Sequence, residues 1–433
     1  ASLQHSFCLV SDADAWESQI NDRVDFILQL PFDGLLFSFG EFMASDPDTI
    51  LRWINHVVER VYQEHPGVEV GAEIHVGDYE DKRITYQGEE LLYYFMPGYA
   101  DPRLSLYVHT VMFYNLYDAA HSTYGHEDFN DHRLFLLSQA AAGRKVHYFP
   151  ESAYWCSFDI DVPLFLPVYT DSRLRELAAL EADLAERSIS MEGVLLFSSG
   201  HEWGFWLTDY LYARAMYDGD FDVQAQLSHV ADGFGPRSEA LSSLLWQLVS
   251  LQRTYLLEDN LIPYLSGEDY YDELGLAMGI VTHPPRVFFP ELLQMSKTLR
   301  AEFAATVLAP IENMAVQFSN IADGLQAIEP DLSAQSYPWV REFTLGTRVL
   351  ALRAEHAVTL YHAVLTVLAA EDPSDSTLQT IEAARVSARG LLDQAQDLER
   401  RAQAHVYEME TLYRYPLPIY IERYENHTIY PWG

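Results

Sequence analysis

Carboxylate and imidazole side chains recur at the ends of short apolar segments in the first half of the chain. Glu73 and His75 alternate along VEVGAEIHVGD, His147 and Glu151 alternate along KVHYFPESAYW, and His109 lies in LSLYVHTVMFYNLYD. Residues two apart on a strand point to the same side, and buried ionisable groups are costly unless they are paired or used. The pattern therefore predicts a polar site at the carboxyl ends of parallel strands, where such sheets carry their chemistry.

Paired carboxylates are the groups that cleave glycosidic bonds, one as a protonated acid and the other as a nucleophile or base. Glu202 directly follows the apolar run GVLLFSSGH and lies among aromatic residues. We predict that Glu202 and Glu151 form the catalytic pair, with Glu41 and Asp118 as the next candidates. This chemistry needs no metal ion and no organic cofactor.

Aromatic rings and hydrogen-bonding side chains surround these carboxylates in the sequence, as expected of a site that stacks on sugar rings and holds their hydroxyls. The predicted substrate-binding residues are His75, His109, Tyr114, Asn115, His147, Tyr154, Trp155, His201, Trp203 and Trp206. An interface between two domains would also recruit tryptophan, and this alternative applies to Trp206 and Tyr210. The segment HSTYGHEDFNDH (His121, His126, His132) contains Gly, Asn and Asp, and it predicts a solvated loop.

The segments FSSGHEWGFWLTDY and YFPESAYW, followed by a long helical part, resemble glycoside-hydrolase-like (β/α)-barrel proteins over roughly residues 1–260. The resemblance implies a sugar-directed hydrolase with its carboxylates at strand ends. Many retaining barrels of this kind have Asn followed directly by the acid/base Glu at the fourth strand. This chain instead has Asn115 with Asp118 three residues later.

Two other functions stay open at this point. A metal-dependent hydrolase could use Glu73, His75, His109, His147 and Glu151, since three imidazoles with a carboxylate suit zinc or iron. Against it, the sequence has no H-x-H pair on a strand, no HExxH and no C-x-x-C. A non-catalytic carbohydrate-binding or structural surface protein would use the same aromatic and acidic residues.

Strand-like and helical segments alternate up to about residue 218, which predicts parallel strands joined by helices. The predicted strands are Ser6–Val10, Gly34–Phe39, Val68–Val76, Leu104–Phe113, Lys145–Pro150 and Gly193–Ser198, with a further one near Val162–Val168. The interpretation is an α/β fold, a (β/α)8-type barrel, irregular or incomplete, over residues 1–218. An open doubly wound sheet is the alternative, although no Gly-rich phosphate loop follows any strand.

The strand pattern disappears after this point. Helical apolar spacing predicts an all-α bundle over residues 219–415, followed by an extended tail over residues 416–433. Within the bundle, the expected helices are Glu239–Leu257, Pro290–Ile328, Val340–Ala370 and Ser376–Tyr413.

The amino-acid composition limits the classes of molecule that the protein is expected to bind. The chain has 433 residues and a formal charge of −37, from 64 acidic and 27 basic residues. A nucleic-acid-binding protein needs a basic surface, so nucleic acid is an unsuitable partner and a carbohydrate or other small polar substrate is expected.

No apolar run is long enough to span a membrane. Cys8 and Cys156 cannot form a disulfide framework. The first residue is not Met, which is consistent with a removed export signal and a secreted, periplasmic or cell-surface location.

Overall fold

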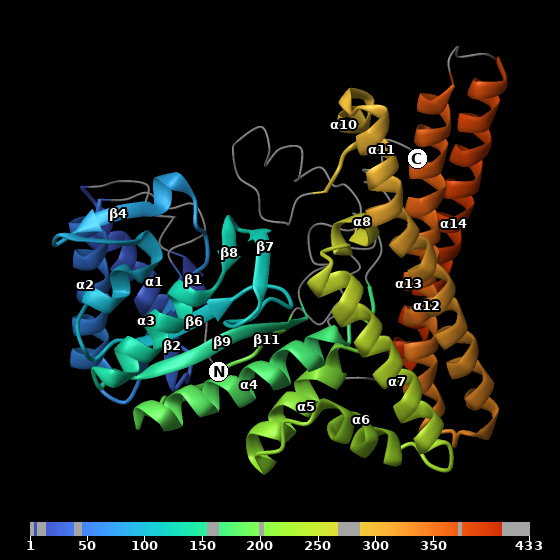
Figure 1. Ribbon diagram of the computed structural model, residues 1–433. Coiled ribbons are helices and arrows are strands. Elements are labelled where there is room, and N and C mark those ends of the chain that lie inside the picture. The colour runs from blue at the N-terminus through green and yellow to red at the C-terminus, as the bar shows by residue number, and fades with distance from the viewer. Residues whose placement is uncertain are drawn as a thin grey trace. The chain divides into compact units, whose positions relative to one another are not determined.

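The computed structural model describes residues 4–6, 14–38, 46–153, 164–198, 203–266, 286–370 and 375–408 (Figure 1). They fall into two compact units: Ala1–Glu151 with Ala178–Phe197, and Ser152–Leu177 with Ser198–Gly433. Each unit is therefore built from two separate stretches of chain. The predicted domain boundary near residue 218 stays a prediction.

A parallel sheet forms the centre of the first unit. Its strands are β1 (Gln4–Ser6), β2 (Gly34–Ser38), β3 (Glu69–Ile74), β6 (Ser105–Thr110), β9 (Val146–Ala153), β10 (Gly193–Val194) and β11 (Phe197–Ser198). The order is β1-β2-β3-β6-β9-β10, and β11 also pairs with β9. Neighbours in this sheet are therefore also neighbours in the sequence. Since parallel crossovers are right-handed, this order carries the connecting helices to one side of the sheet.

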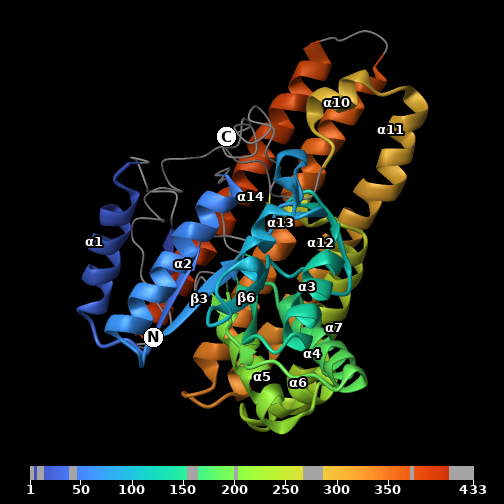
Figure 2. The ribbon, with the colours of Figure 1, turned by 90° about the vertical axis from the view of Figure 1, so that its left-hand side faces the viewer.

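Helices separate the strands. They are α1 (Trp16–Leu28), α2 (Pro47–Glu64), α3 (Asn130–Ala141) and α4 (Val168–Arg187), with the short helices η2 (Glu80–Lys82) and η3 (Tyr93–Tyr99). Two antiparallel hairpins, β4 (Arg83–Tyr86) with β5 (Glu89–Leu92) and β7 (Ala119–Thr123) with β8 (His126–Asp128), leave the main sheet. Helices α1 and α2 lie side by side, as Figure 2 shows.

Helix α2 illustrates why these residues form these elements. Asp46 precedes it, and its side chain accepts a hydrogen bond from the Thr49 N–H, while Pro47 fits the first helical position. The apolar residues recur at helical spacing and are buried: Ile50, Leu51, Trp53, Ile54, Val57, Val58 and Val61. This face anchors the helix to the sheet.

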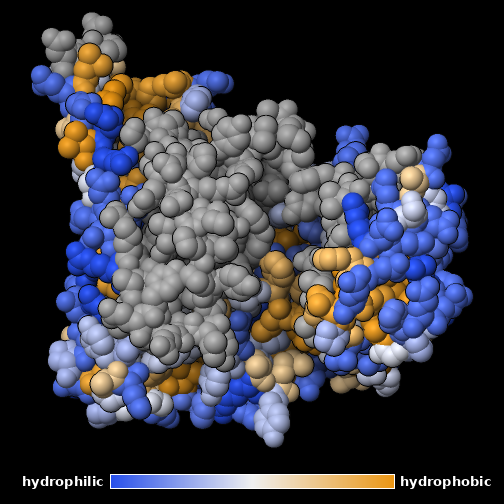
Figure 3. Space-filling model, turned by 180° about the vertical axis from the view of Figure 1, so that it is seen from behind, coloured by the Kyte–Doolittle hydropathy of each residue, from blue (hydrophilic) through white to orange (hydrophobic). Residues whose placement is uncertain are grey.

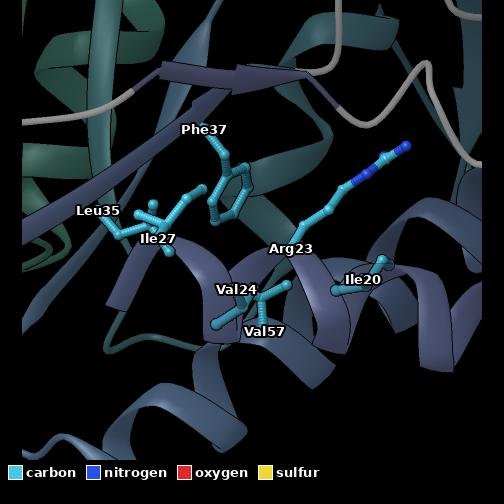
Figure 4. Close-up of a pocket in the computed structure, with 7 residues that line it drawn as sticks. All are labelled: Ile20, Arg23, Val24, Ile27, Leu35, Phe37 and Val57. Atoms are coloured by element: carbon cyan, nitrogen blue, oxygen red, sulfur yellow. The ribbon is translucent and has the colours of Figure 1, made fainter. Parts of the chain in front are cut away.

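Register determines which side of the sheet each side chain occupies. Leu35 and Phe37 of β2 line an apolar pocket with α1 and α2 (Figure 4). These residues pair with Val70 and Ala72 of β3. Successive residues of a strand alternate between its two sides, so Gly71 and Glu73 point to the opposite side. The polar residues of β3 therefore lie on the face that α1 and α2 do not cover.

One arginine fixes the chain before β6. The Arg144 guanidinium donates hydrogen bonds to four backbone carbonyls, those of Gly98 (2.9 Å), Ala100 (3.1 Å), Asp101 (3.0 Å) and Leu104 (3.2 Å). Burial lowers its pKa from the ordinary value for arginine. The side chain thus holds the turn between η3 and β6 in place.

The second unit is mostly helical in its described part. Its helices are α5 (Phe205–Asp218), α6 (Val223–Asp232), α7 (Ser238–Gln252), α8 (Ile262–Ser266), α10 (Phe289–Gln294), α11 (Lys297–Phe303), α12 (Ala309–Ile328), α13 (Tyr337–Ala369) and α14 (Asp375–Glu408), with η4 (Arg253–Glu258), η5 (Ala304–Leu308) and η6 (Glu329–Asp331). The long helix α13 packs against both α12 and α14 (Figure 1).

The mixed α/β class with a parallel sheet and a C-terminal helical region is confirmed. The hairpins β4–β5 and β7–β8 were not predicted. A strand near Val162–Val168 was expected, but α4 begins at Val168, and Phe165 forms only an isolated bridge with Trp203. None of the helices in the described ranges is long and apolar enough to cross a membrane. Among the coloured residues of Figure 3, hydrophobic patches interrupt a mostly hydrophilic surface.

Candidate active site

Four ionisable residues gather at the carboxyl-terminal side of β3, β6 and β9. Glu73 is 2% exposed, His75 7%, His109 4% and Glu151 3%. The Glu73 Oε1 atom lies 4.0 Å from His75 Nε2, and the rings of His75 and His109 are 5.5 Å apart. We call Glu73, His75, His109 and Glu151 the carboxyl-end cluster. Sequence alternation predicted that these residues share a face, and the structure brings them together.

Both oxygens of Glu151 have partners. Its Oε1 lies 3.4 Å from His109 Nε2, and its Oε2 accepts a hydrogen bond from the backbone N–H of Met112. Met112 follows the end of β6 with a φ of 55°, which few residues other than glycine adopt. This backbone turn aims the Met112 N–H at the carboxyl group. Strained backbone of this kind is concentrated at functional sites.

The opposing influences on His109 can be separated. Burial, the largest of them, lowers its pKa, but the hydrogen bond to Glu151 and the negative charges of Glu73 and Glu151 outweigh it. The net effect raises the pKa of His109 above the ordinary value for histidine. The cluster therefore favours keeping a proton beside the Glu151 carboxyl group, as general acid catalysis requires.

Aromatic rings surround the carboxyl-end cluster. His109 contacts the rings of Phe149 and Phe197, with centroids 5.2 Å and 6.2 Å away. His75 lies 5.6 Å from the ring of Tyr94 and 6.1 Å from that of Tyr124. An apolar lining of this kind strengthens the electrostatic interactions inside it.

His147 belongs to a second group on the same face. It stacks on Tyr107 with ring centroids 4.3 Å apart, and its Nε2 lies 3.3 Å from Glu69 Oε1. The Tyr107 ring crosses Gly71, where an added Cβ would come within 2.4 Å of it. We call Glu69, Tyr107 and His147 the amino-end cluster. The structure thus places His147 with Glu69 and not with Glu151.

The predicted residues after β6 hold the local chain together. Asn115 donates to Asp118 at 2.9 Å and accepts hydrogen bonds from the backbone N–H groups of Tyr117 and Asp118. Tyr114 is fully buried, and burial raises its pKa. Asn115 and Asp118 therefore form a turn, a role that suits both residue types.

The histidines of the HSTYGHEDFNDH segment contradict the expectation of a solvated loop. His126 and His132 are 2% and 0% exposed. His126 accepts a hydrogen bond from the Gly77 N–H at 3.2 Å, and His132 donates to the His75 carbonyl at 3.0 Å. Burial lowers the pKa of His126 to about 4 and that of His132 well below its ordinary value. The hairpin β7–β8 carries this segment back onto the end of β3, which buries both rings.

Trp203 and Trp206 lie in the second unit. Trp203 is 2% exposed. Trp206 stacks on Phe343 with centroids 5.5 Å apart and meets the edge of Trp339 at 4.7 Å. Its indole N–H donates to Glu342 at 3.0 Å. The faces of Trp206 are therefore used in packing within the second unit.

Asp209 was not among the predicted site residues. Burial raises its pKa, although the hydrogen bond from Ser152 acts in the opposite direction. The hydroxyl of Ser152 donates to Asp209. Asp209 follows the last predicted strand in the sequence, but its partner Ser152 lies 57 residues earlier, so no local pattern links the two.

Several predicted residues lie outside the described ranges. They are Glu41, Tyr154, Trp155, His201 and Glu202, together with Cys8 and Cys156. Within the described ranges, no group of three or more His, Cys, Asp or Glu residues is arranged to hold a metal ion. The pocket of Figure 4 is apolar apart from Arg23, whose guanidinium points away from it, so it offers no catalytic group.

A scan against protein-family models finds no match to this chain, and no curated protein matches it. The site must therefore be interpreted from its own geometry.

Proposed function

We propose that the protein is a hydrolase acting on glycosides, with the Glu151 carboxyl group as a reacting acid. The observation that carries the proposal is the buried contact of Glu151 with His109 at the carboxyl-terminal side of a parallel sheet. Loss of a glycosidic leaving group requires a proton on its oxygen, and a carboxylic acid kept protonated by its surroundings supplies it.

A second carboxylate completes this chemistry as a nucleophile or as the base that activates water. Glu202 is the proposed partner, as its position after the last strand of the sheet suggests. Glu73 belongs to the same buried cluster as Glu151, and its negative charge raises the pKa of His109.

The finer architecture is also a proposal: an incomplete or irregular (β/α)8-type barrel. The support is the strand order, which follows the chain without reversal. A doubly wound sheet reverses its order, and its ligands bind at that point. In a barrel the order does not reverse, and the site lies at the carboxyl ends of the strands. A secreted, periplasmic or cell-surface location stays a prediction.

Turnover of a panel of aryl glycosides, measured for wild type and two variants, tests the function. Glu151→Gln should lower kcat by about 10²–10⁴-fold, as expected for loss of a general acid. Glu69→Gln is the matched control, because Glu69 lies on the same face and also faces a histidine, His147. It should keep turnover within about threefold, the effect of a modest surface perturbation.

Three outcomes would contradict the proposal. Equal activity of wild type and Glu151→Gln would remove Glu151 from the reaction. Binding of glycans without turnover of any glycoside would favour a carbohydrate-binding protein. Activity lost on dialysis against a chelator and restored by zinc or iron would favour the metal-dependent hydrolase. Glu202→Gln, assayed beside them, tests the proposed second carboxylate.

A further inference from the structure

The contacts of His109 determine where its protons lie. His109 Nδ1 is 2.7 Å from the backbone carbonyl oxygen of Phe149. A carbonyl oxygen only accepts hydrogen bonds, so Nδ1 carries a proton and donates it. In the neutral ring, Nε2 would then present a lone pair toward Glu151.

A carboxylate also presents lone pairs, so the 3.4 Å contact between His109 Nε2 and Glu151 Oε1 requires a proton between them. Glu151 Oε2 is already occupied by the Met112 N–H. The pair therefore shares one proton, as imidazolium with carboxylate or as imidazole with carboxylic acid. Since both side chains are at most 5% exposed, water cannot readily replace this contact.

We propose that His109 is a positioning residue that stores this proton and transfers it to Glu151 during the reaction. This inference rests on the proposed function and adds to it the proton supply of the acid. One proton moves from Nε2 to Oε1, the electron pair of the N–H bond stays on Nε2, and Nδ1 keeps its bond to Phe149. The proton then passes from Glu151 to the leaving oxygen, and a solvent proton restores the pair.

The described groups around His109 agree with this role. Glu73 on β3 and Glu151 on β9 are acidic and favour a proton on the ring. Two other imidazoles, His75 and His132, face the same region, and protons on them would oppose one on His109. His132 is neutral because burial lowers its pKa, and its Nε2–H is held by the His75 carbonyl. The acidic groups on β3 and β9 therefore outweigh the other influences, and the pKa of His109 is raised.

Nitrogen-15 NMR of histidine-labelled protein tests the stored proton without any substrate. In wild type, His109 should keep Nδ1 protonated at every pH and should titrate above the ordinary histidine value of about 6.5. In Glu151→Gln, burial becomes dominant, and the titration should fall by about one pH unit or more, the size expected of coupled groups. Glu69→Gln should leave it unchanged. An identical titration in wild type and Glu151→Gln would overturn the proposal, and so would a ring with Nδ1 unprotonated.

The pH dependence of kcat/KM tests the transfer. The amide of a His109→Gln variant can donate to Glu151 but cannot store a proton, so it stabilises the carboxylate. His109→Asn keeps a donor for the Phe149 carbonyl and removes the group facing Glu151. Both variants should move the alkaline limb of the profile to lower pH by about one unit or more, with kcat falling more than KM rises.

If both variants fold and their kcat/KM profiles keep the alkaline limb of wild type, the proposed proton transfer is wrong. If circular dichroism shows that either variant is unfolded, the NMR comparison of wild type with Glu151→Gln decides alone. If no glycoside is turned over while the NMR result is as expected, the proposed function fails and the shared proton stands.

Discussion

The carboxylate of Glu342 on α13 accepts a hydrogen bond from the indole Nε1 of Trp206 at 3.0 Å. Its other oxygen accepts one from the backbone N–H of Gly204 at 2.9 Å, so a single buried side chain fixes the start of α5. The first N–H groups of a helix have no partner within the helix, and this carboxylate supplies one from a distant segment.

Glu342→Gln should therefore destabilise the second unit by about 1–3 kcal/mol, because the amide NH₂ replaces one of two acceptors. Urea unfolding followed by tryptophan fluorescence measures the change. The control is Glu355→Gln, an exposed residue of the same helix, which should stay within about 0.5 kcal/mol of wild type. Equal effects of the two substitutions would show that the Glu342 contacts contribute nothing to stability.

The buried histidines make the first unit sensitive to acid. The pKa of His126 is about 4 in the folded protein against an ordinary 6.5, so the unfolded chain binds more protons between these values. Stability must then decrease as the pH falls from about 6.5 to about 4. Between pH 7 and pH 5, this one group should cost about 2 kcal/mol.

His126→Gln removes the titrating group and keeps an acceptor for the Gly77 N–H. Amide hydrogen exchange of β3 at pH 7 and pH 5, corrected for the intrinsic exchange rates, should show a smaller loss of protection in this variant. The exposed His229→Gln is the control and should lose as much protection as wild type. A variant with the full wild-type loss would mean that acid acts through other groups.

Substitution of the half-buried Arg144 should lower the stability of the protein strongly. Arg144→Met removes the donor to four carbonyls, and the free energy of unfolding should fall by about 2–4 kcal/mol. Arg144→Lys should recover only part of this, since an ammonium group lacks the planar arrangement of five donors. Arg187→Met, at an exposed position of α4, is the comparison and should be close to neutral in thermal unfolding.

Gly71 should tolerate no side chain while Tyr107 keeps its place. An added Cβ would lie 2.4 Å from the Tyr107 ring, and Gly71→Ala should cost about 1–3 kcal/mol. Gly193→Ala, in the same sheet with nothing within 4 Å of the added carbon, is the matched control. In a double-mutant cycle, Tyr107→Leu should reduce the cost of Gly71→Ala; full additivity would refute the steric explanation.

The parallel sheet and the face of the carboxyl-end cluster could be predicted from the sequence. Alternation along β3 and β9 places Glu73 with His75 and His147 with Glu151 on one side of each strand. The parallel pairing of the strands then brings these sides onto one face of the sheet. The direction in which each side chain turns could not be predicted. Gly71 leaves room for Tyr107 to lie across β3, and the ring of His147 follows Tyr107 toward Glu69.

Other features depend on tertiary packing that no local pattern reveals. The positive φ of Met112 has no signal in its residue type. His126 is buried in an unpredicted hairpin and His132 at the start of α3, although the Gly and Asn of this segment resemble those of an exposed loop. Trp206 has the aromatic neighbours of a sugar site, yet its partners Trp339 and Glu342 come from α13, far away in the sequence.

The division of the chain has a consequence for its synthesis. The polypeptide leaves the first unit at Glu151, re-enters it at Ala178 and leaves again at Phe197. On the ribosome, the first unit therefore cannot be completed before residues 152–177, which belong to the second unit, have already emerged. The boundary between Leu177 and Ala178 falls inside α4, so this one helix contributes residues to both units. Neither unit can be obtained by a single cut in the gene, because each is built from two separate stretches of the chain. Completion of the first unit therefore requires synthesis up to Phe197, whereas the second unit also requires the chain after Ser198.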